Sequence, residues 1–459
     1  MKFKPCVLAW MALMACAQTG YALTLLEAYD AALQNDPVYR AAVRENESGQ
    51  FNRAIGKSAL LPIVSLSYSN SGNNAQRTTP DMLGKDVTQG YQYQSIATTL
   101  SLKQPLLNYE SMAKYRQGIA QGDYSEATFK SRRQELAVRL MTAYTDALFA
   151  QDQLSLAVVQ VKTLLEQKNL NERALQAGEG TITDVLETQS KYDVAQAQVI
   201  EAQAEVDNTR QVLSGMLGRV MPPSEAQAGI AQAFKPEPLF PTTVEAWKAL
   251  AMDGNAELQA QRYAVASAQQ DVAKSEAGHY PRVDLVASSS RNRADSIVTY
   301  NQSSVINSVG IQINFPLYAG GYVVAITQQA MANVQRLEAE LDGKTEKVIV
   351  ELRKQFNLVR SSINRVDALE CAQDSAEKLI LATRKSVLGG VRVNLDVLTA
   401  QQQLHTVRRD LAQARYTYFN AWLKLRFTAG VIEDEDMKKL ASRFAIPLPS
   451  PIKFATAQP

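Results

Sequence analysis

The sequence is poor in the residues that metal and redox sites use. Its 459 residues include three cysteines and two histidines. Cys6 and Cys16 lie in a predicted leader peptide, so Cys371 alone would remain and no internal disulfide could form. His279 and His405 are far apart in the chain, and no P-loop, glycine-rich nucleotide loop or Cys/His metal spacing occurs. These absences argue against an enzyme and predict neither a cofactor nor a metal ion.

The mature chain also lacks an excess of charge and any long apolar run. The formal net charge of +2 equals the charge of Lys2 and Lys4, which both lie in the leader. A near-neutral mature chain has no basic field that would attract nucleic acid. After Ala22 no run of about 18 apolar residues occurs, so no helix is expected to cross a bilayer. Any membrane-spanning part would have to consist of alternating strands.

The N-terminus predicts export from the cytoplasm. Two lysines precede an apolar run, residues 7–15, and small residues at Gly20 and Ala22 fit a cleavage site. Residues 1–22 therefore form a predicted signal peptide and are excluded from the fold. The stretch Leu13-Met14-Ala15-Cys16 also resembles a lipoprotein cleavage box, so lipidation at Cys16 stays an alternative.

The mature chain reads as two similar halves. GEGTITDVLETQ (178–189) is matched by GVRVNLDVLTAQ (390–401), and TLLEAYDAAL at Thr24 by TTVEAWKALA at Thr242. Such ordered matches indicate a duplicated unit of roughly two hundred residues. The predicted organisation is given by these ranges: first repeat 23–220, linker 221–241, second repeat 242–430 and C-terminal tail 431–459.

Each half contains two segments with strand periodicity after a first helix that ends at Leu61-Pro62 or Tyr280-Pro281. Apolar side chains alternate with polar ones, as in Val64, Leu66 and Tyr68 against serines, which is the pattern of a strand with two unlike faces. We expect β-hairpins over 63–103 and 283–315. The polar stretches 69–90 and 288–302 are expected to be loops between the strands.

Long helices follow each predicted hairpin. No proline occurs from Leu106 to Met221 or from Leu317 to Ile446. Apolar residues recur there in alternating steps of four and three, the spacing of packed helical rods. One seam runs Leu136, Leu140, Ala143, Ala147, Ala150, Leu154, Ala157, Val161, Leu164, and the second half repeats it at Ile349, Leu352, Phe356, Val359, Ile363 and Val366. Glycines at 178, 180, 389 and 390 would end the rods, as glycines do at helix C-termini, in turns at the end opposite the strands.

Four strands cannot cross a membrane alone, because both sheet edges would leave unpaired amides and carbonyls in hydrocarbon. A membrane barrel would therefore be shared among chains, and the sequence favours an obligate oligomer. Three copies would give twelve strands, although the pattern itself does not set the number three.

These features together resemble the TolC family of outer-membrane channel proteins. The resemblance rests on the Leu-Pro after the first helix, the paired hairpins, GEGTITDVLETQSKYD, and GGVRVNLDVLTAQQQL followed by RRDLAQARYTYFNAWLKL. The run RAIGKSALLPIVSLSYSNSGNNAQ is most similar to the branch that serves type I protein secretion, such as the alkaline-protease exporters.

The resemblance implies a mainly α fold with a β-barrel portion. Long α-helical hairpins would form a periplasmic α-barrel, and four strands per chain would contribute to a shared twelve-stranded outer-membrane β-barrel of a homotrimer. Implied partners are a periplasmic adaptor protein, an inner-membrane ABC transporter, outer-membrane lipid and a secreted protein substrate that passes through unfolded. The exit duct of a multidrug or metal efflux pump is the alternative, and a periplasmic coiled-coil scaffold without a pore is a rival of another class.

The resemblance also implies two groups of site residues. The hairpin turns would contact the adaptor through Gly178, Glu179, Gly180, Thr181, Gly390, Val391 and Arg392. The periplasmic entrance would be lined and locked at Thr183, Asp184, Arg392 and Asp396. A second acid expected one turn later is Thr399, and a tyrosine of the closing network falls at Val387, so we expect a weaker lock. The alternative for the glycines is plain helix capping, and for Asp184 a capping box with Glu187.

Overall fold

The computed structural model describes residues 22–222, 225, 227–230, 234–294 and 302–445. The predicted signal peptide up to residue 21, with Cys16, lies outside these ranges, as do residues 446–459 of the predicted tail. The chain divides into two compact units, which are described one at a time. Unit 1 comprises Met1–Arg44, Phe129–Ala256 and Thr345–Pro459, and unit 2 comprises Glu45–Thr128 and Glu257–Lys344. Within the described ranges, every helix is too short or too polar to span a bilayer.

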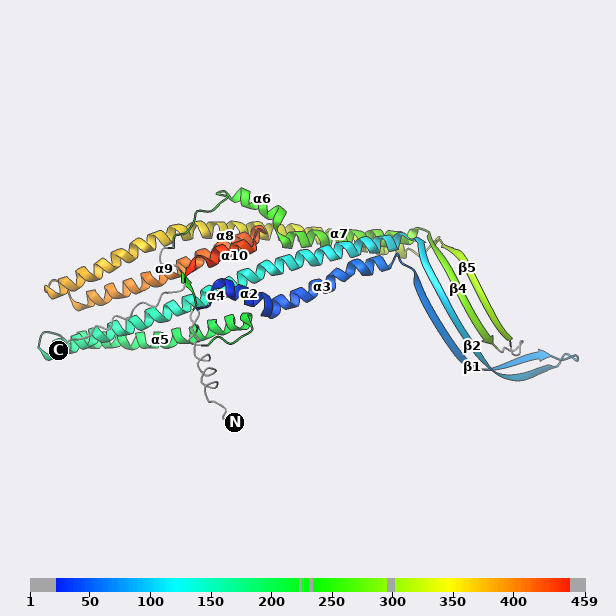
Figure 1. The fold of residues 1–459 in the computed structure, drawn as a ribbon, viewed down its shortest axis with the longest axis horizontal. Coiled ribbons are helices and arrows are strands. Elements are labelled where there is room, and N and C mark those ends of the chain that lie inside the picture. The colour runs from blue at the N-terminus through cyan, green and yellow to red at the C-terminus, as the bar shows by residue number, and fades with distance from the viewer. Residues whose placement is uncertain (1–21, 223–224, 226, 231–233, 295–301, 446–459) are drawn as a thin grey trace, which may run out of the picture. The chain divides into compact units, whose positions relative to one another are not determined.

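Unit 2 is organised around one antiparallel sheet of four strands in the order β1-β2-β4-β5 (Figure 1). The strands are β1 (Ile63–Pro80), β2 (Asp86–Leu107), β4 (Arg282–Ala294) and β5 (Gln302–Asn314). Each half of the chain supplies one hairpin, and β2 pairs with β4 to join the two. Among the described residues, β1 and β5 pair on one side only, so the sheet is open at both edges.

The two faces of this sheet differ in polarity. One face carries a row of four serines, one from each strand, in which Ser65 and Ser101 are hydrogen-bonded at 2.6 Å and Ser288 and Ser308 at 2.8 Å. We call this face, which also holds Lys103 and Asp284, the serine face. The other face carries Leu66, Leu100, Leu102, Leu285, Val309, Ile311 and Ile313, and we call it the apolar face. The predicted alternation is confirmed.

The predicted loop over 69–90 is wrong. β1 continues to Pro80 and β2 begins at Asp86, which leaves a turn of residues 81–85. Polar side chains bond across the strands here, as Asn73 does to Ser95 at 3.0 Å and Thr78 to Thr88 at 2.8 Å. Backbone pairing needs no apolar alternation, so hydropathy does not reveal this ribbon. In the second hairpin, β4 continues to Ala294 and β5 begins at Gln302, while residues 295–301 lie outside the described ranges.

Two helices pack closely within unit 2. The helices α3 (Pro37–Ser58) and α4 (Tyr109–Gln176) approach each other at Gly56 and Gly118. A Cβ on Gly118 would lie 2.4 Å from the Asn52 carbonyl oxygen, so only glycine fits that contact. An ion pair of 2.6 Å between Arg53 and Asp123 joins the same two helices.

The first helix of each half is interrupted, which the sequence pattern did not predict. The chain forms α2 (Leu25–Asn35) and α3 in the first half, and α6 (Val244–Gly254) and α7 (Ala256–Glu276) in the second. Asp36 and Asn255 stand at the two breaks. Asp36 accepts a hydrogen bond of 2.7 Å from the Tyr39 amide, and Pro37 follows it at the first helical position, where its missing N–H costs nothing. Asn255 donates to the Thr428 carbonyl at 2.8 Å.

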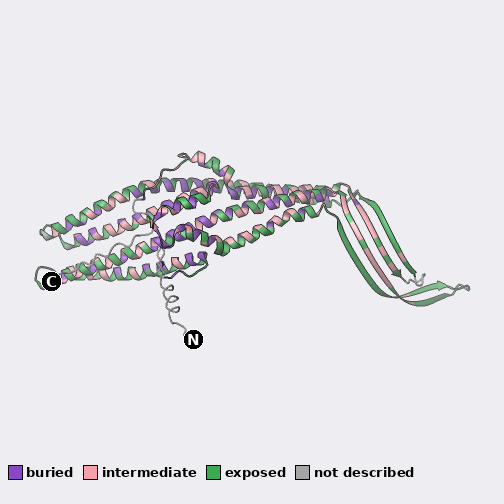
Figure 2. Cartoon of the chain, in the orientation of Figure 1, coloured by how far each residue is buried: buried purple, intermediate pink, exposed green. Residues whose placement is uncertain are grey.

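Unit 1 is a helical assembly whose core lies along the facing sides of its helices (Figure 2). It contains residues of α4 and α8 (Tyr322–Leu388), together with α5 (Ile182–Leu217), α9 (Asn394–Ala429) and α10 (Asp434–Ala441). Fully buried side chains include Leu136, Leu140, Tyr144, Leu213, Leu217, Trp247, Phe419 and Leu423. The small sheet of β3 (Gly229–Ile230) and β6 (Phe444–Ala445) pairs the inter-repeat stretch with the C-terminal stretch.

Most residues of the predicted apolar seams are buried, and Leu154, Val161, Ile349 and Ile363 are half-buried. Leu136, Leu140, Ala147, Ala150 and Leu164 are all buried in the first half. In the second half, Leu352, Phe356, Val359 and Val366 are buried at the predicted spacing. Steps of four and three keep these side chains on one side of the helix, so one continuous stripe packs against neighbouring helices.

Candidate functional site

The first predicted turn joins α4 to α5 and is built around Gly178. Its φ of +75° is in the left-handed region that favours glycine. The Gly178 amide donates to the Leu175 carbonyl at 3.1 Å, and the Glu179 amide donates to the Ala174 carbonyl at 2.9 Å. These two bonds form a Schellman motif, which satisfies carbonyls that the end of a helix leaves free.

The second turn joins α8 to α9 and repeats this geometry around Gly390, whose φ is +73°. The Gly390 amide donates to the Val387 carbonyl at 3.0 Å, and the Val391 amide donates to the Ser386 carbonyl at 2.9 Å. The two turns therefore share one backbone device at equivalent places in the two halves.

The start of α5 is closed by a capping box. The Thr181 hydroxyl oxygen accepts from the Asp184 amide at 3.2 Å, and Asp184 Oδ2 accepts from the Thr181 amide at 3.3 Å and from its hydroxyl at 2.5 Å. The predicted alternative, a box of Asp184 with Glu187, is wrong by one turn. Glu187 instead lies 3.1 Å from Lys191. Because α4 ends at Gln176 and Gly178 turns the chain, the next helix begins at once and Thr181 takes the cap position.

The start of α9 has no such box. Val393 occupies the cap position and has no side chain that could accept a hydrogen bond. Asp396 holds the same position in α9 that Asp184 holds in α5, three residues after the cap. Its carboxylate has a single ion-pair partner among the described residues, Arg392, at 3.9 Å. The two side chains are 52% and 40% exposed, so this contact is weak and the acid faces water.

Apolar side chains surround both turns without being buried. Ile182 and Leu186 are 57% and 61% exposed, and Val391 and Val393 are 81% and 63% exposed. Thr183 and Glu179 are exposed beside them. Exposed apolar groups that gather at one place on a surface are typical of a contact with a partner. The sequence-based prediction did not include Ile182, Leu186 and Val393, although Ile182 follows the cap of α5 and Val393 is the cap of α9.

A small core joins α4, α5 and α9 on the side of the two turns. Leu164 of α4, Ala195 of α5 and Leu398 of α9 are buried against one another, with Val161 and Tyr192 beside them. Leu398 follows Asp396 by two residues, so the position of the acid is fixed by the packing of its own helix. At the two departures from the family pattern, the Thr399 hydroxyl donates to the Leu395 carbonyl at 2.9 Å and Val387 is half-buried.

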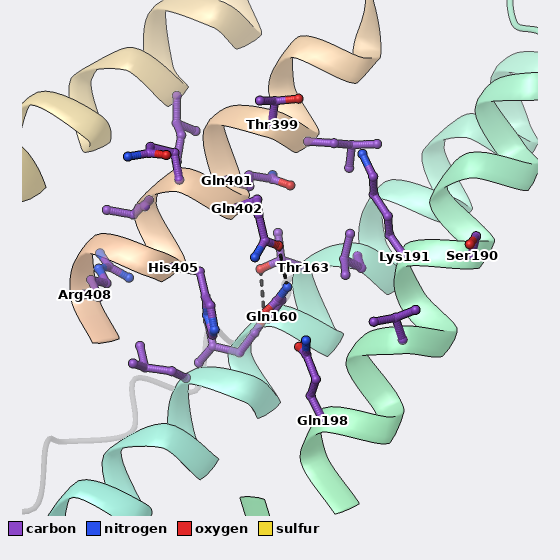
Figure 3. A pocket seen from close by; sticks show the side chains of 18 of the residues that line it. Gln160, Thr163, Ser190, Lys191, Gln198, Thr399, Gln401, Gln402, His405 and Arg408 are labelled. Carbon is purple, nitrogen blue, oxygen red and sulfur yellow. Dashed lines mark hydrogen bonds between the residues drawn. The ribbon is translucent and has the colours of Figure 1, made fainter. Parts of the chain in front are cut away.

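A cavity of about 680 Å³ lies beside this core, among α4, α5, α8 and α9 (Figure 3). Its labelled polar lining consists of Gln160, Thr163, Ser190, Lys191, Gln198, Thr399, Gln401, Gln402, His405 and Arg408. Gln160 donates to Gln402 at 2.9 Å, and Arg408 lies 2.8 Å from Glu377. Burial lowers the pKa of His405, and the nearby Arg409 lowers it further.

The cavity holds none of the usual arrangements for catalysis or metal binding. Its lining has amides, hydroxyls and cations but no carboxylate that could orient His405 as a base. In the described part of the chain, no group of three or more His, Cys, Asp or Glu side chains could hold a metal ion. The candidate functional site of unit 1 is therefore the pair of turns at Gly178 and Gly390.

Known proteins resemble this chain over nearly its whole length. The model of the family described as outer membrane efflux protein matches residues 28–219 and 247–431. The alkaline protease secretion protein AprF of Pseudomonas aeruginosa is 40% identical over 94% of this chain and 89% of its own. The proteases secretion protein PrtF of Dickeya chrysanthemi is 37% identical over 95% of both chains. The crystal structure of the outer membrane protein VceC of Vibrio cholerae covers 88% of this chain and 96% of its own with a TM-score of 0.74, at 18% identity. The resemblance seen in the sequence, including its narrower branch, is confirmed.

Proposed function

The chain belongs to the outer membrane efflux protein family, and on that premise we propose that three copies form the exit duct of a type I protein secretion system. It is an outer-membrane channel protein with a large periplasmic helical part, and its family consists of channels rather than enzymes. In the proposed role, an inner-membrane ABC transporter and a periplasmic adaptor deliver an unfolded protein, which the duct passes to the exterior.

The open amphipathic sheet is the observation that carries this proposal. Its apolar face suits lipid and its serine face suits a water-filled lumen, but β1 and β5 each lack a second neighbour in the described chain. In hydrocarbon, unpaired backbone groups on those edges would cost several kcal/mol each, roughly, so the edges must be paired. Pairing β1 of one copy with β5 of the next closes the sheet, and three copies give a twelve-stranded barrel.

The choice of protein secretion over efflux rests on the relatives. Two proteins named for protease secretion match this chain at 40% and 37% identity along most of their length. TolC-like channels of other systems share the fold, so the fold does not separate the two functions. The alternative function is therefore the exit duct of a multidrug or metal efflux pump, and a gene deletion distinguishes the two.

The two turns are proposed to face the adaptor and the entrance of the duct. The proposed adaptor contact consists of Gly178, Glu179, Gly180, Thr181, Gly390, Val391 and Arg392. The exposed Ile182 and Val393 add apolar surface to it. At the entrance we assign different roles to Asp184 and Asp396. Asp184 holds its own turn together, whereas three copies of Asp396 would place negative charge around a narrow aqueous passage and favour cations. Thr183 lies beside Asp184, and Arg392 would moderate the charge of Asp396.

Deletion of the gene tests the function. Loss of one or more secreted proteins from the culture medium, with unchanged tolerance to drugs and metals, is the expected result. Complementation with the intact gene should restore secretion. Normal secretion combined with increased sensitivity to drugs or metals would contradict the proposal and favour the efflux alternative.

A further inference from the structure

The apolar face of the sheet ends in two arginines on one strand. Arg291 and Arg293 lie two residues apart on β4, so their side chains leave the strand on the same face. The strand register assigns that face. Arg291 pairs with Thr98 and Val305, and Thr98 pairs with Tyr68, in the row next to Leu66 and Leu100. Both arginines therefore lie on the apolar face, and both are exposed.

The position of the arginines along the strand matches the thickness of a membrane. The apolar face begins at Val283, which pairs with Ile313, and continues through Leu285 and Ala287. Val283 to Arg291 is nine residues of β4 and Val283 to Arg293 is eleven, and about 9–11 residues are what a tilted strand needs to cross a bilayer. At roughly 3.3 Å per residue and a tilt of about 40°, the two arginines lie about 20 and 25 Å above Val283.

The free-energy cost of placing a charge in lipid favours an interfacial position for both arginines. An arginine on the lipid face costs about 2–4 kcal/mol at the bilayer midplane and about 0–1 kcal/mol near an interface. An apolar band about 25 Å tall that begins at Val283 ends at the level of Arg293 and about 5 Å above Arg291. The long side chain of Arg291 can extend that distance, so both guanidinium groups reach the headgroups. The short periplasmic-side connections to α4 and α8 are at the other end of the strands, so this is the outer leaflet.

No carboxylate in the four strands is positioned to neutralise the pair. The strands contain two acids, Asp86 and Asp284. Asp284 is on the serine face, where its carboxylate lies 2.9 Å from the Lys103 ammonium group. Asp86 pairs with Pro80 beside the turn of the first hairpin, far along β2 from Thr98. The neighbours of Arg293 in its row are Ile96, Ser303 and Asn70.

We propose that Arg291 and Arg293 form a binding site for the phosphorylated headgroup of an outer-leaflet lipid. Two guanidinium groups on strand positions about 6–7 Å apart can converge on one phosphate, and arginine binds phosphate oxygens through two parallel N–H donors. The apolar residues below, Leu66 and Val309 among them, would contact the acyl chains of the same lipid. This inference rests on the proposed membrane location of the sheet.

Native mass spectrometry of the purified full-length protein in detergent tests the site. The probe is diphosphorylated lipid A, titrated onto the wild type and onto the Arg291→Gln/Arg293→Gln double variant. The double variant loses the charge-assisted hydrogen bonds of two guanidinium groups to phosphate, so it should bind at least roughly tenfold more weakly. The control is Arg77→Gln/Lys85→Gln, which removes the same charge from the exposed end of the first hairpin and should bind within about twofold of the wild type.

Further arms identify the ligand and separate this site from the proposed function. A dephosphorylated lipid A should bind the wild type as weakly as the double variant binds the intact lipid, and inorganic phosphate at equal concentration should not displace the lipid. Equal binding by wild type and double variant, or displacement by inorganic phosphate alone, would overturn the lipid site. Conductance in planar bilayers is recorded for the same samples. A wild type that conducts while the two proteins bind lipid equally refutes this inference only, whereas a wild type that never conducts refutes the proposed channel and the inference with it.

Discussion

The turn at Gly178 and the turn at Gly390 have the same backbone but different caps. Both use a glycine with positive φ and the same pair of amide-to-carbonyl bonds to end a long helix. The helix that follows begins with Thr181 in one case and Val393 in the other. Each then places an aspartate three residues later, so the two acids occupy equivalent positions.

The residue at the cap position therefore determines which hydrogen bonds the acid three residues later can form. Thr181 engages Asp184 through three hydrogen bonds, which hold that carboxylate against its own turn. The Val393 carbonyl accepts from the Asp396 amide at 3.1 Å, but the Val393 side chain cannot bond to the Asp396 carboxylate, which is left with an exposed arginine at 3.9 Å. The two turns therefore share a backbone but differ at the cap, and only the acid after Val393 has a carboxylate free of side-chain capping bonds.

The largest loss of stability is expected when the positive-φ glycine of either turn is replaced. Gly178→Ala and Gly390→Ala should each destabilise their turn by about 1–2 kcal/mol, because an L side chain is strained at positive φ. A Cβ added at either glycine would meet no other atom within 4 Å, so the cost is conformational rather than steric. Hydrogen exchange of peptides that span each turn measures this loss of local stability.

Gly215→Ala is the matched control for the two turn variants. Gly215 lies in the last turn of α5 with open space around it, and alanine there should slow exchange, because alanine has a higher helix propensity than glycine. Unchanged exchange in both turn variants would show that the backbone of the turns does not require glycine. Faster exchange in the control would show that a glycine-to-alanine change destabilises these helices whatever the φ of the glycine.

Exchanging the caps sharpens the comparison and should have an intermediate effect. Thr181→Val should weaken the first turn of α5 by about 1 kcal/mol, the usual value of a side-chain cap. Val393→Thr should strengthen the first turn of α9 by a similar amount and draw Asp396 into a capping box. Exchange rates of amides 182–186 and 394–398 report both. Opposite shifts are expected, and equal shifts of one sign would contradict the role assigned to the cap.

The smallest effect is expected for Arg392→Gln. Its pair with Asp396 is long and exposed, so its loss should change the local stability of α9 by less than about 0.5 kcal/mol. Lys191→Gln provides the comparison in α5, because Lys191 forms an exposed pair with Glu187 at 3.1 Å. Both effects should vanish at high salt. A loss above about 1 kcal/mol that persists in high salt would mean that Arg392 holds the turn.

The helical part of the fold was largely predictable because its signals are local and repeated. Seam residues such as Leu140 and Val359 recur at a fixed spacing, and glycines such as Gly178 and Gly390 punctuate proline-free runs. The breaks at Asp36 and Asn255 were missed because the helical pattern continues on both sides of them. Local signs of the breaks were present, Pro37 after Asp36 in the first half and Gly254 before Asn255 in the second.

The strand limits and the caps depended on information that hydropathy does not carry. Residues 72–80 are polar on both faces, and cross-strand bonds such as Thr78 to Thr88 extend the hairpin through them. For Asp184, both Thr181-x-x-Asp184 and Asp184-x-x-Glu187 fit a capping box, and the choice depends on where α4 ends. The outward arginines needed the strand register, because a shift by one residue would turn them to the serine face.

Ion selectivity in planar bilayers tests the central claim most directly, by comparing Asp396→Asn with Asp184→Asn. The reversal potential under a salt gradient should move toward that of a non-selective channel in Asp396→Asn. In Asp184→Asn it should stay close to the wild-type value, while exchange at the start of α5 accelerates. A large shift in Asp184→Asn with none in Asp396→Asn would contradict the assignment of the two acids.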